Sequence, residues 1–297
     1  MKRIRAFIKA HKKTAVLSVL SLFLCLGVLF SSLFFHFVPE AKYRLKNFFV
    51  TSFSSCRLKV CSPDTEPFTL QELQNDVRVS FDRSMMLISA SHPLPQDAEL
   101  SIGEYKDSGV YMDECVFGAY EALAKEIRDR FDNKLYIKSA YRSWQEQEQE
   151  YASSPELAAA PGSSEHQAGL ALDLYVAYHA GYAFIECDEG LFAVTEGYRY
   201  GFILRYPYDA VEITGIAYEP WHLRYVGAPH AELITKNGLC LEQYLEKLEL
   251  GAFYKYGSYL VTRQIPADGG DVLLPEGFKS ATVSPDNCGA YVITVRM

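Results

Sequence analysis

His166 and Asp173 lie seven residues apart in a largely small and apolar stretch, SSEHQAGLALDLY, at residues 163–175. Side chains alternate along a strand, so we expect Asp173 on the same face as Gly169 and Ala171, with His166 in the turn before the strand. Burying an unpaired carboxylate is costly, and a zinc ion, which binds both imidazole and carboxylate groups, would satisfy the two residues together. For an isolated pair, a turn cap at the histidine and a salt bridge at the aspartate are the simpler interpretation.

A second stretch, YEPWHLRYVG at residues 218–227, places Glu219 three residues before His222. The residue before a proline avoids the α-helical region, so Pro220 predicts a strand or a turn here. Two histidines and one aspartate would leave the fourth tetrahedral position of a zinc ion for water, which is typical of a catalytic site. Zinc lowers the pKa of bound water to about 7, so the carboxylate of Glu219, beside His222, would suffice as the base that takes the water's proton.

A third stretch, SAYRSWQEQEQEY at residues 139–151, contains the S-x-x-E capping box of Ser143 and Glu146. Arg142 then directly precedes the cap, and Gln147 is the fourth helical residue. In a hydrophobic staple these two positions touch, so the sequence predicts a guanidinium and an amide side by side. The pair is either a solvated helix start or a clamp for an anion, since arginine binds carboxylates through two hydrogen bonds.

Helices and strands alternate irregularly around these stretches, which indicates an α+β fold. Residues 112–131 have apolar side chains at helical spacing and begin with Asp113 as a cap. Residues 229–248 read as a helix broken at Asn237 and Gly238. The predicted strands lie at residues 133–141, 169–176 and 200–207.

The N-terminal segment has the character of a membrane anchor. Residues 14–38 contain no Asp, Glu, Lys or Arg and follow six basic residues, so we predict an uncleaved span with a cytoplasmic N-terminus. A cleaved signal peptide is the alternative, but the apolar run is about twice the usual length. The predicted organisation is a tail at 1–13, the span at 14–38, a stalk at 39–67, a catalytic domain at 68–250 and a small β extension at 251–297.

The charge and the cysteines limit the partners and the chemistry further. The net charge is −8, and leaving out the six basic residues at the N-terminus gives −14 for the rest of the chain. An acidic chain of this kind argues against a nucleic-acid partner. The six cysteines after the apolar segment would form up to three disulfides or remain buried free thiols. His92 and His230 are next to prolines and are predicted to be surface groups.

Together the three stretches resemble the D-alanyl-D-alanine carboxypeptidases of the VanY type. SEHQAGLALD matches the pattern S-x-H-x-x-G-x-A-x-D of that family, EPWH matches its second motif, and YRS and GFILRYP occur in the expected order. The resemblance covers roughly residues 80–245. It leaves the N-terminal segment and the C-terminal extension without a counterpart.

The resemblance implies a central antiparallel sheet that carries a zinc ion held by His166, Asp173 and His222. It implies Glu219 as the general base and Arg142 as the group that stabilises the oxyanion or orients the scissile carbonyl. It also implies a pocket for a terminal D-alanine, lined by Gln147, Ser164, Tyr206 and Trp221.

The activity implied is that of a membrane-anchored zinc carboxypeptidase that removes the C-terminal D-alanine from peptidoglycan stem peptides ending in D-Ala-D-Ala, outside the cytoplasmic membrane of a bacterium. One alternative is an L,D-carboxypeptidase of the same family that acts on tetrapeptides. The other is a zinc-stabilised binding module without turnover, as in the hedgehog signalling domain, which resembles this fold. The presence of both Glu219 and Arg142 favours an enzyme.

Overall fold

The computed structural model describes Ser21 and residues 38–52, 54–156, 158–267 and 270–297. The predicted tail at 1–13 and nearly all of the predicted membrane span at 14–38 lie outside this part of the chain. Within it, no helix is both long enough and apolar enough to cross a bilayer. The chain divides into two units, one up to Lys46 and one from Asn47 onward, and α2 (Pro39–Ser52) runs through the division.

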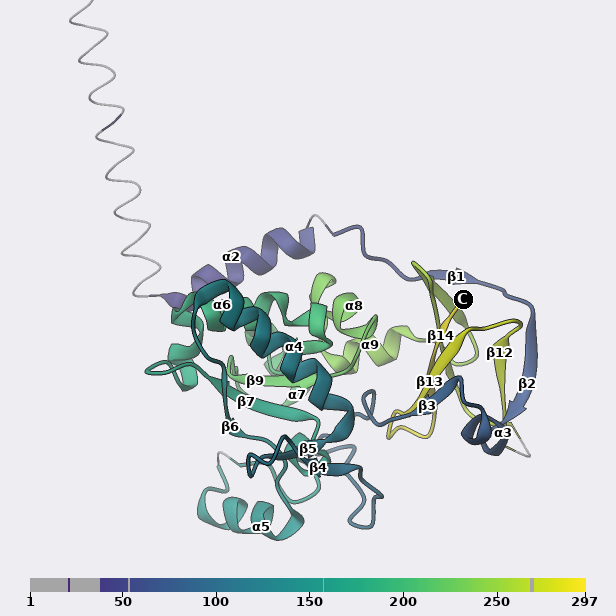
Figure 1. Cartoon of the computed structure of the whole chain (residues 1–297), viewed down its shortest axis with the longest axis horizontal. Coiled ribbons are helices and arrows are strands. Elements are labelled where there is room, and N and C mark those ends of the chain that lie inside the picture. The colour runs from purple at the N-terminus through teal and green to yellow at the C-terminus, as the bar shows by residue number, and fades with distance from the viewer. Residues whose placement is uncertain (1–20, 22–37, 53, 157, 268–269) are drawn as a thin grey trace, which may run out of the picture. The chain divides into compact units, whose positions relative to one another are not determined.

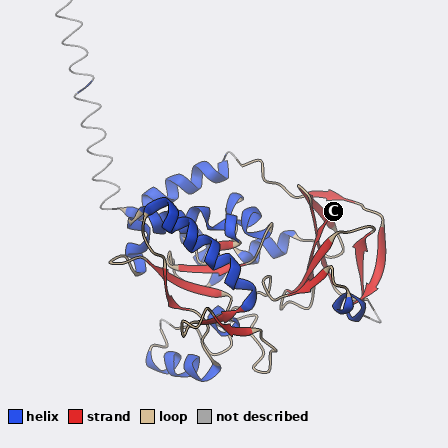
Figure 2. Cartoon of the chain, viewed as in Figure 1, coloured by secondary structure: helices blue, strands red, loops and turns tan. Residues whose placement is uncertain are grey.

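A four-stranded antiparallel sheet in the second unit has the strand order β6-β7-β9-β8 (Figure 1). Its members are β6 (Tyr136–Ser139), β7 (Ala171–Tyr175), β9 (His222–Tyr225) and β8 (Phe202–Leu204). Helices and strands are mixed along the chain around this sheet (Figure 2). The α+β class and the antiparallel sheet predicted for the chain are confirmed.

The helices of this unit begin and end close to where the sequence predicts. α4 (Glu114–Phe131) packs against α6 (Asp188–Glu196), and the Asp113 side chain caps α4 by accepting a hydrogen bond from Cys115 N at 3.0 Å. The helix predicted at 229–248 is indeed broken at Asn237 and Gly238 and forms α8 and α9. The remaining helical segments are α5 (Trp144–Ser153), α7 (Val211–Thr214), α8 (His230–Lys236), α9 (Leu241–Lys247), η1 (Glu165–Ala168), η2 (Gly181–Glu186), η3 (Gly197–Tyr200) and η4 (Tyr208–Ala210).

The C-terminal strands form a second sheet, together with strands from the beginning of the unit. Its order is β1-β10-β11-β14-β13-β3, antiparallel throughout except for the parallel pair of β13 and β3. The other strands of the described residues form two short two-stranded ribbons, one of β2 with β12 and one of β4 with β5. The bounds are β1 (Lys59–Cys61), β2 (Thr65–Thr69), β3 (Val79–Phe81), β4 (Ile102–Glu104), β5 (Tyr111–Asp113), β10 (Phe253–Tyr256), β11 (Tyr259–Gln264), β12 (Asp271–Pro275), β13 (Ser280–Pro285) and β14 (Tyr291–Arg296), with α3 (Leu70–Asn75) after β2.

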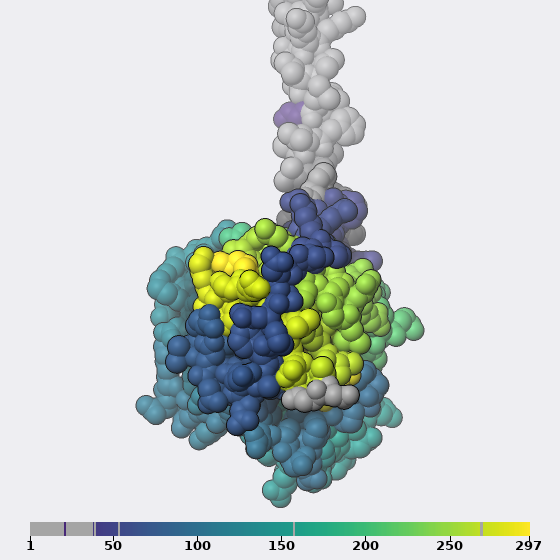
Figure 3. Space-filling view, turned by 90° about the vertical axis from the view of Figure 1, so that its right-hand side faces the viewer, coloured from purple at the N-terminus to yellow at the C-terminus, as the bar shows by residue number. Residues whose placement is uncertain are grey.

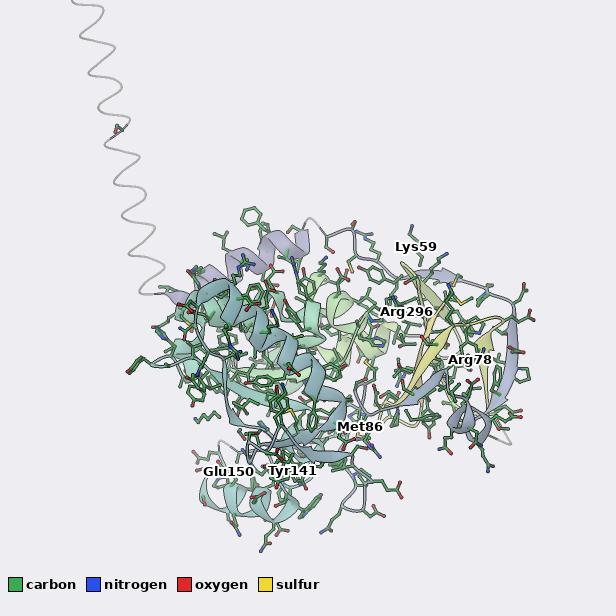
Figure 4. All side chains as sticks on the ribbon, viewed as in Figure 1. Lys59, Arg78, Met86, Tyr141, Glu150 and Arg296 are labelled. Atoms are coloured by element: carbon green, nitrogen blue, oxygen red, sulfur yellow. The ribbon has the colours of Figure 1, made fainter. Side chains whose placement is uncertain are left out.

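This pairing differs from the separate stalk and β extension that we predicted from the sequence. Segments near both ends of the second unit lie side by side on one face, blue and yellow in Figure 3. Lys59 of β1 is paired with Lys255 of β10, and Arg296 lies at the end of β14 in the same sheet (Figure 4). Short alternating runs predict strands but do not specify partners, because those partners are here about 200 residues apart.

The two faces of the six-stranded sheet are buried in different cores, as the alternation of side chains requires. Val261 and Val292 pack with buried residues of α8 and α9 and with Ile203 of β8. Leu260 and Ile293, one residue away, pack with the ribbon of β2 and β12 and with α3. The first of these cores joins the C-terminal sheet to the sheet that carries the predicted site.

His230 is buried in this junction, so the prediction that it is a surface group was wrong. Its Nδ1 lies 2.8 Å from the Tyr244 hydroxyl of α9, and its Nε2 lies 2.7 Å from Thr294 Oγ1 of β14. Burial lowers the pKa of this imidazole to about 3. The side chain is a neutral link between two helices and the C-terminal sheet, which the neighbouring proline did not indicate.

We expect this histidine to make folding stability dependent on pH below about 6.5. The unfolded chain binds a proton at His230 near the ordinary pKa, whereas the folded chain does not until about pH 3. Stability contributed by the neutral imidazole is therefore present above pH 6.5 and is lost as the pH falls, by up to about 1.4 kcal/mol per pH unit. Urea unfolding between pH 4 and 7 should show a shallower dependence for His230→Gln, and equal slopes would contradict this role.

All six cysteines in the described residues are free thiols. Cys56 and Cys240 are buried and Cys288 is exposed. Of the two alternatives left open by the sequence, free thiols agree with the structure. None of the disulfides considered is present within this part of the chain.

Candidate active site

The three predicted metal ligands converge from three neighbouring segments. His166 lies on η1, Asp173 on β7, and His222 begins β9, where it is paired directly with Asp173. One ligand atom from each lies within 4.8 Å of the other two. Both histidines are buried, and the aspartate is half-buried.

The orientation of these groups suits one shared cation. His166 Nε2 lies 3.4 Å from Asp173 Oδ2, and His222 Nδ1 lies 3.1 Å from Asp173 Oδ1. The His166 Nδ1 is 2.7 Å from the Ala140 carbonyl oxygen and donates to it, so Nε2, which faces the carboxylate, is the ring nitrogen available to a metal ion. Two imidazole nitrogens and a carboxylate are the donor set that zinc takes in open catalytic sites, so these residues fit zinc.

Asp173 and His222 each shift the pKa of the other. Burial alone would raise the pKa of Asp173, but hydrogen bonds from His166 and His222 outweigh it and hold that pKa far below its usual value. Burial would also lower the pKa of His222, but its bonds with Asp173 and Glu165 raise it to about 9. The Asp173 carboxylate is therefore negative at neutral pH, and a cation that binds here would displace a proton from the His222 imidazole.

Gly169 connects η1 to β7 in a way that the sequence did not predict. It ends η1 with a φ of +68°, so it does not lie on the strand, and only Ala171 and Asp173 share the predicted face. A Cβ at this glycine would lie 2.6 Å from Asp113 N, which donates a hydrogen bond to the Gly169 carbonyl oxygen at 3.0 Å. Glycine thus permits the close approach that fixes His166 relative to the start of α4.

Glu219 lies in the turn before β9, in agreement with the strand or turn predicted from Pro220. Its N–H donates to the Tyr206 carbonyl oxygen at 3.2 Å, and its carbonyl oxygen accepts from His222 N at 3.1 Å. Its Oε2 lies 3.7 Å from His222 Nδ1, the nitrogen that faces Asp173. Burial raises the pKa of this carboxyl group, which makes it a stronger base than an exposed glutamate.

Arg142 and Gln147 are in contact, as the capping-box argument predicts. Ser143 and Glu146 form the capping box of α5, and Arg142 Nη1 donates to Gln147 Oε1 at 2.9 Å. Arg142 Nη2 also donates to Ser139 Oγ at 3.3 Å. The Gln147 amide is fully buried and donates in turn to the Ala159 carbonyl oxygen at 2.6 Å. The guanidinium is therefore held in one orientation.

Every site residue predicted from the sequence lines one cavity of about 200 Å³. Tyr206 is buried, and its ring centroid lies 4.8 Å from that of His222. The ring centroids of Trp221 and Tyr182 are 5.1 Å apart, in an edge-to-face arrangement. The nine predicted residues in its wall are Arg142, Gln147, Ser164, His166, Asp173, Tyr206, Glu219, Trp221 and His222.

A wider cavity of about 930 Å³ lies against the same arginine. Its wall includes residues 109–111, residues 137–142 and one side of α5. Arg142 and Glu150 line both cavities, so the wider one continues directly from the site. Tyr141 and Glu150, two residues of its wall, are labelled in Figure 4.

Four charged residues beneath the site were missed in the sequence. Glu165, directly before the first histidine, is fully buried between two arginines, Arg205 and Arg224, and Arg205 also binds Glu242. Arg205 occurs in the GFILRYP segment, but its partners are 37 and 40 residues away. A buried arginine requires a buried acid as its partner. The sequence does not show that Arg205 and Arg224 are buried, so it could not predict these ion pairs.

Comparison with known proteins places these residues in a family. The model of the family described as "VanY: D-alanyl-D-alanine carboxypeptidase" matches residues 109–228. The bifunctional D-Ala-D-Ala dipeptidase and D-Ala-D-Ala carboxypeptidase VanXYC of Enterococcus gallinarum is 37% identical over 56% of this chain and 95% of its own length. A D-alanyl-D-alanine carboxypeptidase of Enterococcus faecium is 31% identical over 63% of this chain and 64%, slightly under two thirds, of its own length.

A solved structure gives the same relationship. The vancomycin-resistance D,D-dipeptidase VanXYg, in complex with a D-Ala-D-Ala phosphinate analogue, superposes with a TM-score of 0.61 and 25% identity. The superposition covers 80% of this chain and 100% of VanXYg. On this combined similarity in sequence and fold, the chain belongs to the VanY family of D-alanyl-D-alanine carboxypeptidases.

Proposed function

We propose that this protein is a zinc-dependent carboxypeptidase that removes the C-terminal D-alanine from peptidoglycan stem peptides ending in D-Ala-D-Ala. The observation that carries the proposal is the convergence of His166, Asp173 and His222 within 4.8 Å, in a cavity shared with Glu219 and Arg142. The relatives named above are carboxypeptidases and dipeptidases of D-Ala-D-Ala, which supports the same substrate class.

The roles of the side chains follow from their geometry. Zinc bound by the three ligands would supply Lewis acidity, polarising the substrate carbonyl and making water acidic near neutral pH. Glu219, half-buried beside the ligand nitrogen of His222, would take the proton of the attacking water and later give it to the leaving amine. Arg142, fixed by Gln147 and Ser139, would stabilise the negative charge that develops on the carbonyl oxygen.

The wider cavity supports cleavage of peptides longer than a dipeptide. It continues from the site through Arg142 and Glu150 and has about 930 Å³ for the residues that precede the scissile bond. The cavity at the metal ligands alone has about 200 Å³. We therefore expect kcat/KM for a pentapeptide to exceed that for free D-Ala-D-Ala by at least about tenfold. A tenfold difference corresponds to about 1.4 kcal/mol of transition-state stabilisation, which one additional contact in the wider cavity would supply.

The test is incubation of the purified protein with a pentapeptide ending in D-Ala-D-Ala, the tetrapeptide that lacks the last residue, and free D-Ala-D-Ala. Each is measured with and without a zinc chelator. The proposal predicts release of D-alanine mainly from the pentapeptide, lost with chelator and restored by zinc. Cleavage mainly of the tetrapeptide would instead identify an L,D-carboxypeptidase, and zinc binding with no product from any peptide would identify a binding module.

We further propose that residues 14–38 anchor the protein in the cytoplasmic membrane, with the catalytic unit on the outer side of a bacterium. The support is the uncharged apolar run after six basic residues. Cell fractionation with protease added to intact spheroplasts tests this directly. Recovery of the full-length chain in the membrane fraction, with protease digestion of the catalytic unit, is the expected result. A soluble or protease-protected chain would contradict it.

A further inference from the structure

The buried Glu165 has two carboxylate oxygens with different partners. Its Oε1 accepts hydrogen bonds from Arg205 Nε at 2.7 Å and from Arg224 Nη1 at 2.6 Å. Its Oε2 faces His222 Nε2 at 3.5 Å, at the long end of hydrogen-bond distance. The opposite ring nitrogen of His222, Nδ1, faces Asp173 and the cavity.

We propose that Glu165 is a positioning residue that keeps the proton of His222 on Nε2, so that Nδ1 is free to bind the metal ion. The inference rests on the proposed metal site but assigns a role to a residue outside it. A neutral imidazole has one N–H and one lone pair, and the group bonded to one nitrogen decides which nitrogen can bind a metal. Glu165 and Asp173 can both only accept, so each ring nitrogen of His222 faces an acceptor. When a metal ion takes Nδ1 together with Asp173, the proton that remains is the one on Nε2, which Glu165 accepts.

The two arginines prevent Glu165 from turning away or reaching the metal site itself. Arginine is only a donor, so Oε1 must remain between the two guanidinium groups. Arg224 is fixed by the carbonyl oxygens of Ser84 and Met86 at 2.9 and 2.7 Å, and Met86 is labelled in Figure 4. Arg205 is fixed by Glu242 through two hydrogen bonds of 2.9 and 2.6 Å.

The cluster is also balanced in charge. Glu165, Arg205 and Arg224 have side chains no more than 1% exposed, and Glu242 is 13% exposed. Two carboxylates and two guanidinium groups cancel, which offsets the cost of burying each. The cluster therefore holds a fixed acceptor under His222 without contributing a net charge to the site.

The variant Glu165→Gln tests this role with little change in shape. Its amide oxygen must take the place of Oε1 between the arginines, which directs the amide NH2 toward His222 Nε2. Two donors would then face each other unless His222 moves its proton to Nδ1, where it blocks the metal. Competition titration with a zinc indicator should give a zinc affinity about 10- to 100-fold weaker than in the unmodified full-length chain.

Glu242→Gln is the matched control, because it makes the same substitution in the same cluster without touching His222. We expect Glu242→Gln to lower the thermal midpoint measured in the presence of chelator. Its zinc affinity should stay within about threefold of that of the unmodified chain, because the hydrogen bond between Glu165 and His222 is kept. Unchanged zinc affinity in Glu165→Gln would overturn the proposal. So would an equal loss in both variants, since it would show a general effect of the cluster on folding.

A measurement on the unmodified chain covers the case in which Glu165→Gln does not fold. In the zinc-loaded protein with ¹⁵N-labelled histidine, the proposal predicts that His222 is metallated at Nδ1 and keeps a protected proton on Nε2. Metallation at Nε2 would refute it. Neither readout depends on peptide hydrolysis, so a zinc-binding protein without peptidase activity would contradict the proposed function and leave this inference intact.

Discussion

Replacing Glu219 by glutamine is expected to lower turnover of the pentapeptide by about 10²- to 10⁴-fold, the usual contribution of a positioned general base. The amide has nearly the size and shape of the carboxyl group but cannot accept the proton. Glu219 is held by two backbone hydrogen bonds to Tyr206 and His222, so the turn should keep its conformation. Zinc content and the thermal midpoint should stay close to those of the unmodified protein.

A matched control lies nearby on α7. Glu212 is exposed and does not line the cavity, so Glu212→Gln should keep full activity. Initial rates of D-alanine release at saturating and at low peptide concentration measure both variants. Activity of Glu219→Gln within a few-fold of the unmodified enzyme would exclude this residue as the base.

Replacing Arg142 by alanine is expected to lower kcat by about 10²- to 10³-fold, as for loss of one preorganised donor to an oxyanion. The guanidinium is already fixed by Gln147 and Ser139, so it need not be ordered during the reaction. Arg142→Lys keeps the charge but loses the planar fork, so it should recover only part of the activity. The loss should appear mainly in kcat, because the charge that Arg142 stabilises develops in the transition state.

Lys134→Ala controls for the simple loss of a positive charge near the sheet. Lys134 is exposed, precedes β6 and lines neither cavity, so its variant should retain activity. Steady-state kinetics with the pentapeptide separates the two constants. If Arg142→Ala raised only KM and left kcat unchanged, the arginine would be a substrate-binding group and not an oxyanion donor.

Several residues of the candidate site could be singled out because they carry a local signal in the sequence. The proline after Glu219 excludes a helix, and the capping box places Arg142 against Gln147. The spacing from His166 to Asp173 and the EPWH segment gave the resemblance to one family. Each of these signals lies within a few neighbouring residues, and the structure brings those residues into one cavity.

The features that could not be predicted depend on distant pairs. Glu165 is an ordinary charged residue in the sequence, and its partners Arg205 and Arg224 are 40 and 59 residues away. His230 seemed exposed because of its proline, but its burial comes from packing against β14. The C-terminal strands likewise pair with β1 and β3, which local alternation cannot specify.

The most direct test of the account is a crystal structure of the protein grown with zinc, with anomalous diffraction measured on both sides of the zinc absorption edge. The account predicts one strong anomalous peak about 2.0–2.2 Å from His166 Nε2, a carboxylate oxygen of Asp173 and His222 Nδ1, with the Glu219 carboxylate beside the open position. A peak that lacks any of these three ligands, or no peak between them in zinc-saturated crystals, would contradict it.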